Sequence, residues 1–266
     1  MSDGQYQGNQ RVVTFGEIML RLSTPGHQRF VQADSFDVNY GGGEANVAVS
    51  LANYGIDTAF VSRVPKHDIG QSAINSLRKF GVDTSLILLG GHRLGAYFLE
   101  TGASQRASRV IYDRADSAIS QITPADLDPD AIFRGATWFH WTGITPALGD
   151  GPAASVALLA REAKQRGLRV SCDLNYRAKL WTPEQAQAVM TPLMEHVDVC
   201  ICNEEDAQTS LGLQAGETDV HAGQLDETGY AKLCEELMTR FGFDTVAITL
   251  RESFSASRNG WSAIMR

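Results

Sequence analysis

Several common signals are scarce or missing in this sequence. Its 266 residues contain only four cysteines and eight prolines, which argues against a small disulfide-stabilised fold and against proline-rich linkers. No stretch approaches the roughly 18 consecutive apolar residues of a membrane span. The polar start, residues 1–10, lacks the apolar centre of a secretion signal, and we expect it to be a frayed tail. We therefore expect neither a membrane protein nor a disulfide scaffold.

Positive charge is also in short supply. The chain has 23 Lys and Arg against 31 Asp and Glu, which gives a net charge of −8 and a pI near 5.2. No basic stripe is present to meet phosphates, so nucleic acid is not the expected partner. The remaining composition, 43% hydrophobic and 20% charged, is typical of one soluble α/β domain with an appendage or of two small domains.

The cysteines do not form a metal or redox motif. Cys172, Cys200 and Cys202 fall in apolar, strand-like runs, and no histidine cluster joins them. Cys200 and Cys202 would share one face of a strand without the geometry of a disulfide. We therefore predict buried, reduced thiols in a cytoplasmic protein.

Apolar runs and segments with helical spacing alternate along most of the chain. Such repetition predicts a mostly parallel sheet with helices on both faces, and ligands bind such sheets at the carboxyl ends of the strands. Strands are predicted over residues 12–18, 58–64, 83–89, 137–143, 168–175, 197–203, 244–250 and 260–265. Helices are predicted over residues 45–54, 68–80, 151–166, 183–196, 204–211 and 228–241. The polar segment 212–224 is expected at the surface, and residues 251–259 receive no assignment.

A different pattern interrupts this alternation. Residues 96–101 and 108–114 have the composition of a β-hairpin. With a further strand at 36–40, the hairpin predicts a small sheet that covers the main body as a lid. The expected boundaries are 11–266 for the domain and about 20–41 and 94–115 for the lid.

The most distinctive stretch runs from Tyr40 to Asn46. Its three glycines, Gly41–Gly43, can adopt positive φ angles and let a ligand approach the backbone closely. The helix predicted over 45–54 would present N-terminal N–H groups to an anionic or hydroxyl-rich ligand. Glu44 and Asn46 add polar groups that a helix used only for packing does not need. We favour a binding loop over a simple tight turn.

Polar side chains also close the strand predicted at 168–175. Asp173, Asn175 and Arg177 alternate along the chain, so an extended backbone would place them on one face. Such a group is costly in a core and useful in a cleft. An Asp–Arg pair at the edge of the sheet is the alternative.

Asn203-Glu204-Glu205-Asp206 follows the strand predicted at 197–203 in the same way. Its oxygen atoms are the hard ligands that Mg²⁺ prefers, usually through water. Acidic residues are also favourable at a helix N-terminus, so capping explains this stretch equally well.

The second strand of the hairpin carries Tyr112 and Arg114 on one face, and Tyr97 lies on its partner strand. A tyrosine beside an arginine can hydrogen-bond a polyol and form a bidentate pair with a carboxylate. An exposed strand face that merely carries a charge is the alternative.

Taken together, these stretches resemble the ribokinase-like (PfkB-type) sugar kinases, and among them the kinases of 2-keto-3-deoxygluconate. The resemblance implies a three-layer α/β sandwich with a mostly parallel central sheet and a β-sheet lid. The matching segments span nearly the whole chain in the family's order. They are Gly16-Glu17, Gly41–Asn46, Gly95-Ala96-Tyr97, Tyr112–Arg114, Thr142–Leu148, Asp173–Arg177 with Trp181, and Asn203–Asp206.

The resemblance implies a role for each position, with ATP and Mg²⁺ as cofactors. Substrate contacts are implied for Gly42, Gly43, Glu44, Asn46, Tyr97, Tyr112, Arg114 and Arg177. Nucleotide or phosphate contacts are implied for Asn175, Tyr176, Arg177 and Asn203. Asn203 and Asp206 would hold Mg²⁺ through water, and Asp206 is one methylene shorter than the family's Glu. The family's lids often pack against each other, which implies a homo-oligomer.

Two arginines at the sugar site favour an acidic substrate. Arg114 and Arg177 could pair bidentately with the carboxylate of a 2-keto-3-deoxy sugar acid, whereas a neutral sugar has no use for them. The alternatives are a kinase of a neutral sugar such as fructose or ribose, and a non-catalytic sugar-acid sensor. A Rossmann dehydrogenase is disfavoured because no G-x-G-x-x-G follows the first strand.

One family motif is missing. Kinases of this family carry a Gly-Ala-Gly-Asp sequence whose Asp is the catalytic base, and the 266 residues do not contain it. The resemblance implies that this Asp would lie beyond Arg266, so no catalytic residue is assigned within the chain. We therefore expect a C-terminally incomplete kinase with little or no turnover, because phosphoryl transfer depends on positioning and charge stabilisation.

Overall fold

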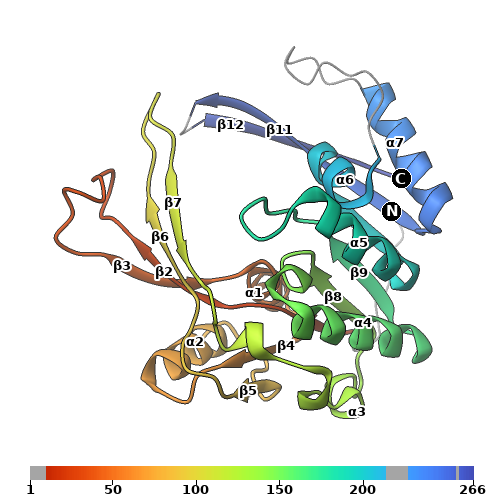
Figure 1. The fold of residues 1–266 in the computed structure, drawn as a ribbon, viewed down its shortest axis with the longest axis horizontal. Helices are drawn as coiled ribbons and strands as arrows, with labels where there is room; N and C mark the ends of the chain where they lie inside the picture. The colour runs from red at the N-terminus through yellow and green to blue at the C-terminus, as the bar shows by residue number, and fades with distance from the viewer. Residues whose placement is uncertain (1–9, 214–226, 256–257) are drawn as a thin grey trace.

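The computed structural model describes residues 10–213, 227–255 and 258–266. The expected tail and most of the expected surface segment at 212–224 therefore lie outside the described residues. Within these ranges the chain forms one large sheet covered by helices and one small sheet that extends from it (Figure 1).

Eight strands form the large sheet in the order β12-β11-β10-β9-β8-β1-β4-β5. Neighbouring strands are parallel except for the antiparallel pair β11 and β12. Their bounds are β1 Arg11–Phe15, β4 Asp57–Val64, β5 Ile87–Leu89, β8 Trp138–Thr142, β9 Arg169–Asp173, β10 Val199–Cys202, β11 Thr245–Ser255 and β12 Arg258–Met265. The predicted mostly parallel α/β sheet is confirmed.

Helices cover both faces of this sheet. Val13 and Phe15 of β1 and Trp141 of β8 are buried in a core shared with α3 to α7, while Phe60 of β4 belongs to a second core with α1 and α2. The side chains of a strand alternate between its faces, and β4 contributes to both cores, with Ala59 and Val61 in the first and Phe60 and Val64 in the second. The helices are α1 Gly43–Asn53, α2 Asp68–Arg78, α3 Pro129–Ile132, α4 Asp150–Gln165, α5 Pro183–Leu193, α6 Glu204–Leu211 and α7 Glu227–Phe241.

The small sheet has the order β3-β2-β6-β7, and Figure 1 shows it projecting away from the helix-covered body. Its strands are β2 Met19–Ser23, β3 Asp37–Gly41, β6 Ala96–Glu100 and β7 Arg109–Asp113. The predicted antiparallel hairpin is confirmed as β6 and β7. β2 was not predicted. Three residues separate it from the end of β1, and it lies between β3 and the hairpin strand β6.

Helix α2 buries only part of the side that its helical spacing predicts. The predicted positions are Ile69, Ala73, Leu77 and Phe80, and of these Ala73 and Leu77 are buried, together with Ile74. Ile69 and Phe80 are 44% and 41% exposed. The helix ends at Arg78, so Phe80 lies beyond its last turn and does not follow the helical spacing.

Residues 251–259 received no assignment, and those of them that the structure describes, 251–255 and 258–259, belong to two paired strands. β11 continues to Ser255 and pairs antiparallel with β12, with Arg251 opposite Trp261. Pairing with a second strand stabilises an extended backbone that its polar side chains do not predict.

Arg266 follows β12 directly and extends its pairing by one residue. Its N–H donates to the Val246 carbonyl at 3.0 Å, and its carbonyl accepts from the Val246 N–H at 2.9 Å. Its guanidinium lies 3.8 Å from Glu235 Oε1 of α7. The last residue of the chain is therefore held at the edge strand of the large sheet.

The predicted buried thiols are confirmed. All four cysteines are buried and form no disulfide, and burial raises the pKa of the Cys172 thiol well above its usual value. Such thiols are unreactive because little thiolate is present. None of the helices in the described ranges combines the length and apolar character that a membrane crossing requires.

Candidate active site

The glycine stretch joins the small sheet to helix α1. Gly41 ends β3, and Gly43 begins α1. Gly42 is extended, with φ −175 and ψ 157, and a Cβ on it would lie 1.8 Å from the backbone oxygen of Glu17. The expectation of a positive φ is therefore wrong here. This glycine is required because two backbone segments approach each other closely.

Residues from three parts of the chain surround this loop. A Cβ on Gly41 would lie 3.4 Å from Asn46 Oδ1 and 3.6 Å from the Tyr97 hydroxyl. A Cβ on Gly43 would lie 3.6 Å from Asn175 Nδ2. Helix α1 begins here without a side-chain cap, so its first N–H groups can bind an anionic or hydroxyl-rich ligand.

Glu44 does not point to a ligand, contrary to its predicted substrate contact. Its side chain is 1% exposed. Its Oε1 accepts hydrogen bonds from the Thr142 N–H at 3.1 Å, the Thr142 hydroxyl at 2.8 Å and the Thr145 hydroxyl at 2.7 Å. Burial raises the pKa of this carboxyl to about 7, although the two threonines oppose the shift. Glu44 therefore links the start of α1 to the end of β8 and has a structural role.

One face of the small sheet carries a row of polar side chains. Arg21 lies opposite both Asn39 and Tyr97, and Tyr97 lies opposite Tyr112. The two tyrosine rings are 5.8 Å apart, and burial raises the pKa of Tyr97 while Arg21 opposes the shift. The predicted pair Tyr97 and Tyr112 is therefore brought together. The sequence did not identify Arg21 or Asn39, because their strands showed no motif.

Arg114 is bound to a buried carboxylate. Its guanidinium donates to Glu17, which also accepts a hydrogen bond of 3.1 Å from the Ser117 hydroxyl. The Glu17 side chain is 2% exposed and that of Arg114 is 9% exposed. Burial raises the pKa of Glu17, and Arg114 and Ser117 oppose the shift. The predicted pairing of Arg114 with a substrate carboxylate is corrected here, since this guanidinium already neutralises Glu17.

The polar residues after β9 do not share one face as predicted. The strand ends at Asp173, and Asn175 takes a left-handed backbone conformation with φ 40. Its N–H donates to Asp173 Oδ1 at 3.1 Å, which compensates for the unusual geometry. This turn directs the Asn175 amide to Gly43, while Arg177 is exposed and donates to the Tyr176 carbonyl at 2.8 Å.

Asn203 and Asp206 form a helix capping box. Asn203 Oδ1 accepts from the Asp206 N–H at 2.7 Å, and Asp206 Oδ2 accepts from the Asn203 N–H at 3.4 Å. The other Asp206 oxygen accepts from the Tyr176 N–H at 3.0 Å. Capping therefore accounts for both residues without a metal, and it also positions the loop after β9.

The same residues are a poor fit for a directly ligated Mg²⁺ ion. No group of three or more His, Cys, Asp or Glu side chains suited to a metal occurs in the part of the chain that the structure describes. Burial raises the pKa of Asp173 to about 6, and the neighbouring Asp206 adds to the shift. Two carboxylates that repel each other attract a cation, and they fit an Mg²⁺ ion held through water.

A cavity of about 960 Å³ lies between β7 and the loop after β9. Its charged lining is mostly basic, with one carboxylate. Arg114 and Arg177 were predicted here, and Arg109 and Lys179 were not, because single basic residues in a strand and a loop carry no motif. The residues that line it are Arg109–Ala115 and Arg177–Leu180.

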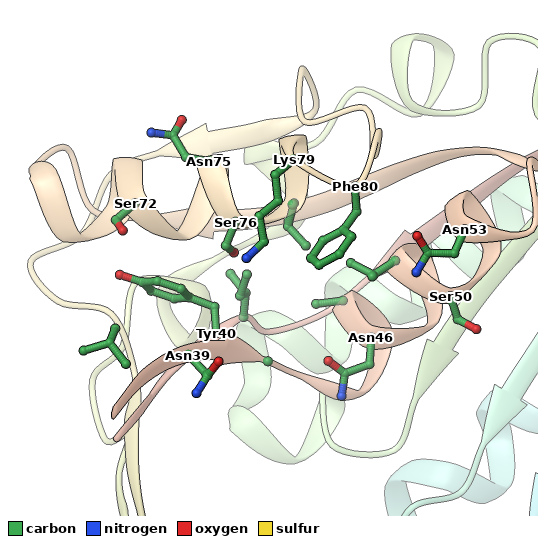
Figure 2. Close-up of a pocket in the computed structure, with 16 residues that line it drawn as sticks. Asn39, Tyr40, Asn46, Ser50, Asn53, Ser72, Asn75, Ser76, Lys79 and Phe80 are labelled. Atoms are coloured by element: carbon green, nitrogen blue, oxygen red, sulfur yellow. The ribbon is translucent and has the colours of Figure 1, made fainter. Parts of the chain in front are cut away.

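A second groove, of about 730 Å³, lies between β3, α1 and α2. Figure 2 shows Tyr40, Ser76 and Phe80 directed into the space between β3 and α2. Asn39 and Asn46 are directed away from α2 in the same view. Gly41 and Asn46 also line this groove, so it reaches the glycine loop.

The fold and the site together define a class of protein. A doubly covered parallel sheet, a glycine loop at a helix N-terminus and a small sheet above it make up the ribokinase-like fold. The profile described as "pfkB family carbohydrate kinase" matches residues 9–252. The chain belongs to this family, whose members are sugar kinases, phosphotransferases with an alcohol group as acceptor.

Individual relatives agree with this assignment. The crystal structure of 2-dehydro-3-deoxygluconokinase from Thermotoga maritima is 53% identical, with a TM-score of 0.92 over 96% of this chain and 77% of that one. A protein of Haloferax volcanii named 2-dehydro-3-deoxygalactonokinase is 35% identical over 94% of this chain and 74% of its own length. Fructokinase-1 of Oryza sativa subsp. japonica is 30% identical over 80% and 66% of the two chains.

Proposed function

We propose that this protein is an ATP-dependent kinase of 2-keto-3-deoxygluconate. The observation that carries the proposal is the mostly basic cavity lined by Tyr112, Arg114, Arg177 and Lys179. A sugar acid needs hydrogen-bonding groups for its hydroxyls and cations for its carboxylate, and the site offers both. The two relatives named for 2-dehydro-3-deoxy sugar acids support the same substrate class.

In this proposal the sugar lies between the glycine loop and the small sheet. Gly42 and Gly43 offer backbone N–H groups, and Asn46, Tyr97 and Tyr112 meet the hydroxyls. The positive end of helix α1 stabilises negative charge that develops at the reacting oxygen. The small sheet acts as a lid, and residues 11–266 act as one kinase domain.

The nucleotide would bind on the other side of the loop, near Asn175. ATP supplies the transferred phosphoryl group, and Mg²⁺ neutralises its charge. Asn175, Tyr176 and Arg177 would position the phosphates, and Asn203 and Asp206 would contact the hydrated ion through water.

No catalytic base is assigned to any residue of the chain. The 266 residues contain no Gly-Ala-Gly-Asp sequence, so the proposal names no residue for this role. The structure places Arg266 beside β11 rather than at the glycine loop, so Arg266 itself takes no part in the proposed site. We expect little turnover from these residues alone.

Two other substrates belong in the test. The galactonate epimer is favoured by the name of the Haloferax volcanii relative, and the two acids differ only in the orientation of one hydroxyl. A neutral sugar such as fructose is favoured by the rice relative, but it leaves the basic cavity without a purpose. A non-catalytic sugar-acid sensor would bind the acid without consuming ATP.

We also propose that the protein is a cytoplasmic homo-oligomer that assembles through its lid. The outer face of the small sheet exposes apolar side chains, among them Val38 at 60% and Ile111 at 43%. Phe36 and Phe98 pack edge to face on the same side, with ring centroids 5.7 Å apart. An apolar face of this kind is typical of an interface between subunits, and the groove in Figure 2 continues it at the base of β3.

The test measures thermal stability with and without each candidate ligand. The ligands are 2-keto-3-deoxygluconate, its galactonate epimer, gluconate and fructose. A ligand at 100 times its dissociation constant stabilises a protein by about 2.7 kcal/mol. Stabilisation by the keto acids and not by fructose supports the proposal, and stabilisation by fructose alone overturns it. Release of ADP that depends on the keto acid would contradict the expectation of little turnover.

A further inference from the structure

We infer that Lys179 supplies the cation that meets the carboxylate of the sugar acid. The inference rests on the proposed function and assigns a specificity-determining residue to the same site. Arg114 and Arg177 were the first candidates for this role, because both are arginines near the sugar site. The contacts of both arginines in the structure favour a different residue for this role.

Arg114 is the weaker of the two candidates. Its guanidinium donates to Glu17, and both side chains are buried. A substrate carboxylate would have to compete with a protein carboxylate that has no other cation among the described residues. Removing the cation from a buried carboxylate is strongly unfavourable. Arg114 therefore keeps Glu17 neutralised and supports the ring of Tyr112, with its Cζ 5.7 Å from the ring centroid.

The two remaining arginines of the cavity are directed elsewhere. Arg177 is exposed, and its guanidinium donates to the Tyr176 carbonyl at 2.8 Å. In the proposed function it serves the phosphate side of the site. Arg109 is three residues before Tyr112 on β7, so strand alternation places the two side chains on opposite faces of the lid.

Lys179 is on the same side as the tyrosine. Its Nζ lies 5.3 Å from the centroid of the Tyr112 ring and 3.4 Å from the carbonyl oxygen of Val110. These are weak contacts, and Lys179 takes part in no ion pair with another described residue. Its ammonium group is therefore available to a carboxylate that is placed against Tyr112.

The position of Lys179 also connects the two parts of the site. It belongs to the loop after β9 on the main body, whereas Tyr112 and Val110 belong to the lid. A carboxylate bound between Lys179 and Tyr112 would touch both parts. Recognition of the acid and closure of the lid would then depend on the same cation.

The experiment compares two ligands that differ in one charge. 2-Keto-3-deoxygluconate and its methyl ester have the same hydroxyls, but only the acid has a carboxylate. Binding of each is measured by titration calorimetry to the wild-type chain, Lys179→Met, Lys179→Arg and Lys66→Met. Lys66 is an exposed lysine between β4 and α2, and it serves as the matched control for loss of one surface charge.

A charged hydrogen bond corresponds to about a 10- to 100-fold change in affinity. We expect Lys179→Met to lose this factor for the acid and to bind the ester as the wild type does. Lys179→Arg is expected to restore most of the acid affinity, and Lys66→Met to change neither ligand. The melting temperature without ligand verifies that each variant folds.

Three outcomes would overturn the inference. Lys179→Met could bind the acid as tightly as the wild type, which shows that another cation meets the carboxylate. It could lose acid and ester equally, which shows that Lys179 only supports the lid. If the wild type binds fructose and not the keto acid, the proposed function itself fails and the inference fails with it. The first two outcomes leave the proposed function intact.

Discussion

The substitution Glu44→Gln tests whether the buried carboxyl that joins α1 to β8 titrates near pH 7. The carboxyl is fully buried, and its pKa is raised from 4.5 to about 7 by burial. Because the folded state binds this proton more tightly than the unfolded state, the group adds stability below pH 4.5 that is lost as the pH rises to about 7. A shift of this size corresponds to about 3 kcal/mol as an order of magnitude.

Glutamine preserves the shape of the side chain and removes the ionisation. Its carboxamide oxygen can still accept the hydrogen bonds from Thr142 and Thr145. At pH 8 the wild type holds a buried negative charge and Glu44→Gln does not, so the variant should be more stable by up to about 3 kcal/mol. At pH 5 the wild-type carboxyl is protonated in the folded state, and the two proteins should differ little.

The assay is urea unfolding of both proteins from pH 5 to pH 8, analysed as a difference in the free energy of unfolding. Taking the difference removes the contribution of other titrating groups, such as Asp173. Glu236→Gln, at an exposed position of α7, is the control for loss of a surface carboxylate. If the difference between Glu44→Gln and the wild type stays constant over this range, the assignment of a buried carboxyl titrating near pH 7 is wrong.

Three further predictions concern the loop, the buried ion pair and the lid. Gly42→Ala should destabilise the fold by about 1–3 kcal/mol or more in urea unfolding, because its Cβ meets the Glu17 backbone. Gly43→Ala should have a smaller effect, since its nearest contact is 3.3 Å, and equal effects would contradict the stated clash. Arg114→Met should destabilise by about 3–5 kcal/mol by leaving Glu17 unpaired, and adding Glu17→Gln should recover most of that loss, whereas additive losses would exclude a coupled pair. Val38→Asp should shift the protein to monomers in light scattering, and an unchanged mass would exclude the outer lid face as the interface.

Local patterns in the sequence were sufficient for the elements of the main body. Apolar periods of about two and about 3.6 residues located strands such as β4 and helices such as α4, because a strand or helix buries one face wherever it packs. The capping residues of α6 were equally local, since a cap involves side chains only three residues apart. The order of the matching stretches was also enough to indicate the family.

Contacts between residues far apart in the chain could not be predicted from such local patterns. The path of β2 into the lid depends on pairing with strands that follow it in the chain. The continuation of β11 from Arg251 to Ser255 likewise depends on pairing with β12, because its polar side chains give no alternation to detect. A strand without a regular pattern becomes recognisable only when its neighbour is known.

The sequence by itself determined the family, the alternating α/β architecture and most of the residues that gather at the glycine loop. Only the tertiary structure decided which charges are still available to a ligand. Glu44 and Arg114 carry the residue types expected of a binding site, yet both are consumed by partners about 100 positions away. Lys179 has no motif, but its place opposite Tyr112 leaves its charge without an ion-pair partner among the described residues. The reason is physical: a side chain's chemistry is set by its type, whereas its availability is set by burial and by partners that the fold brings together.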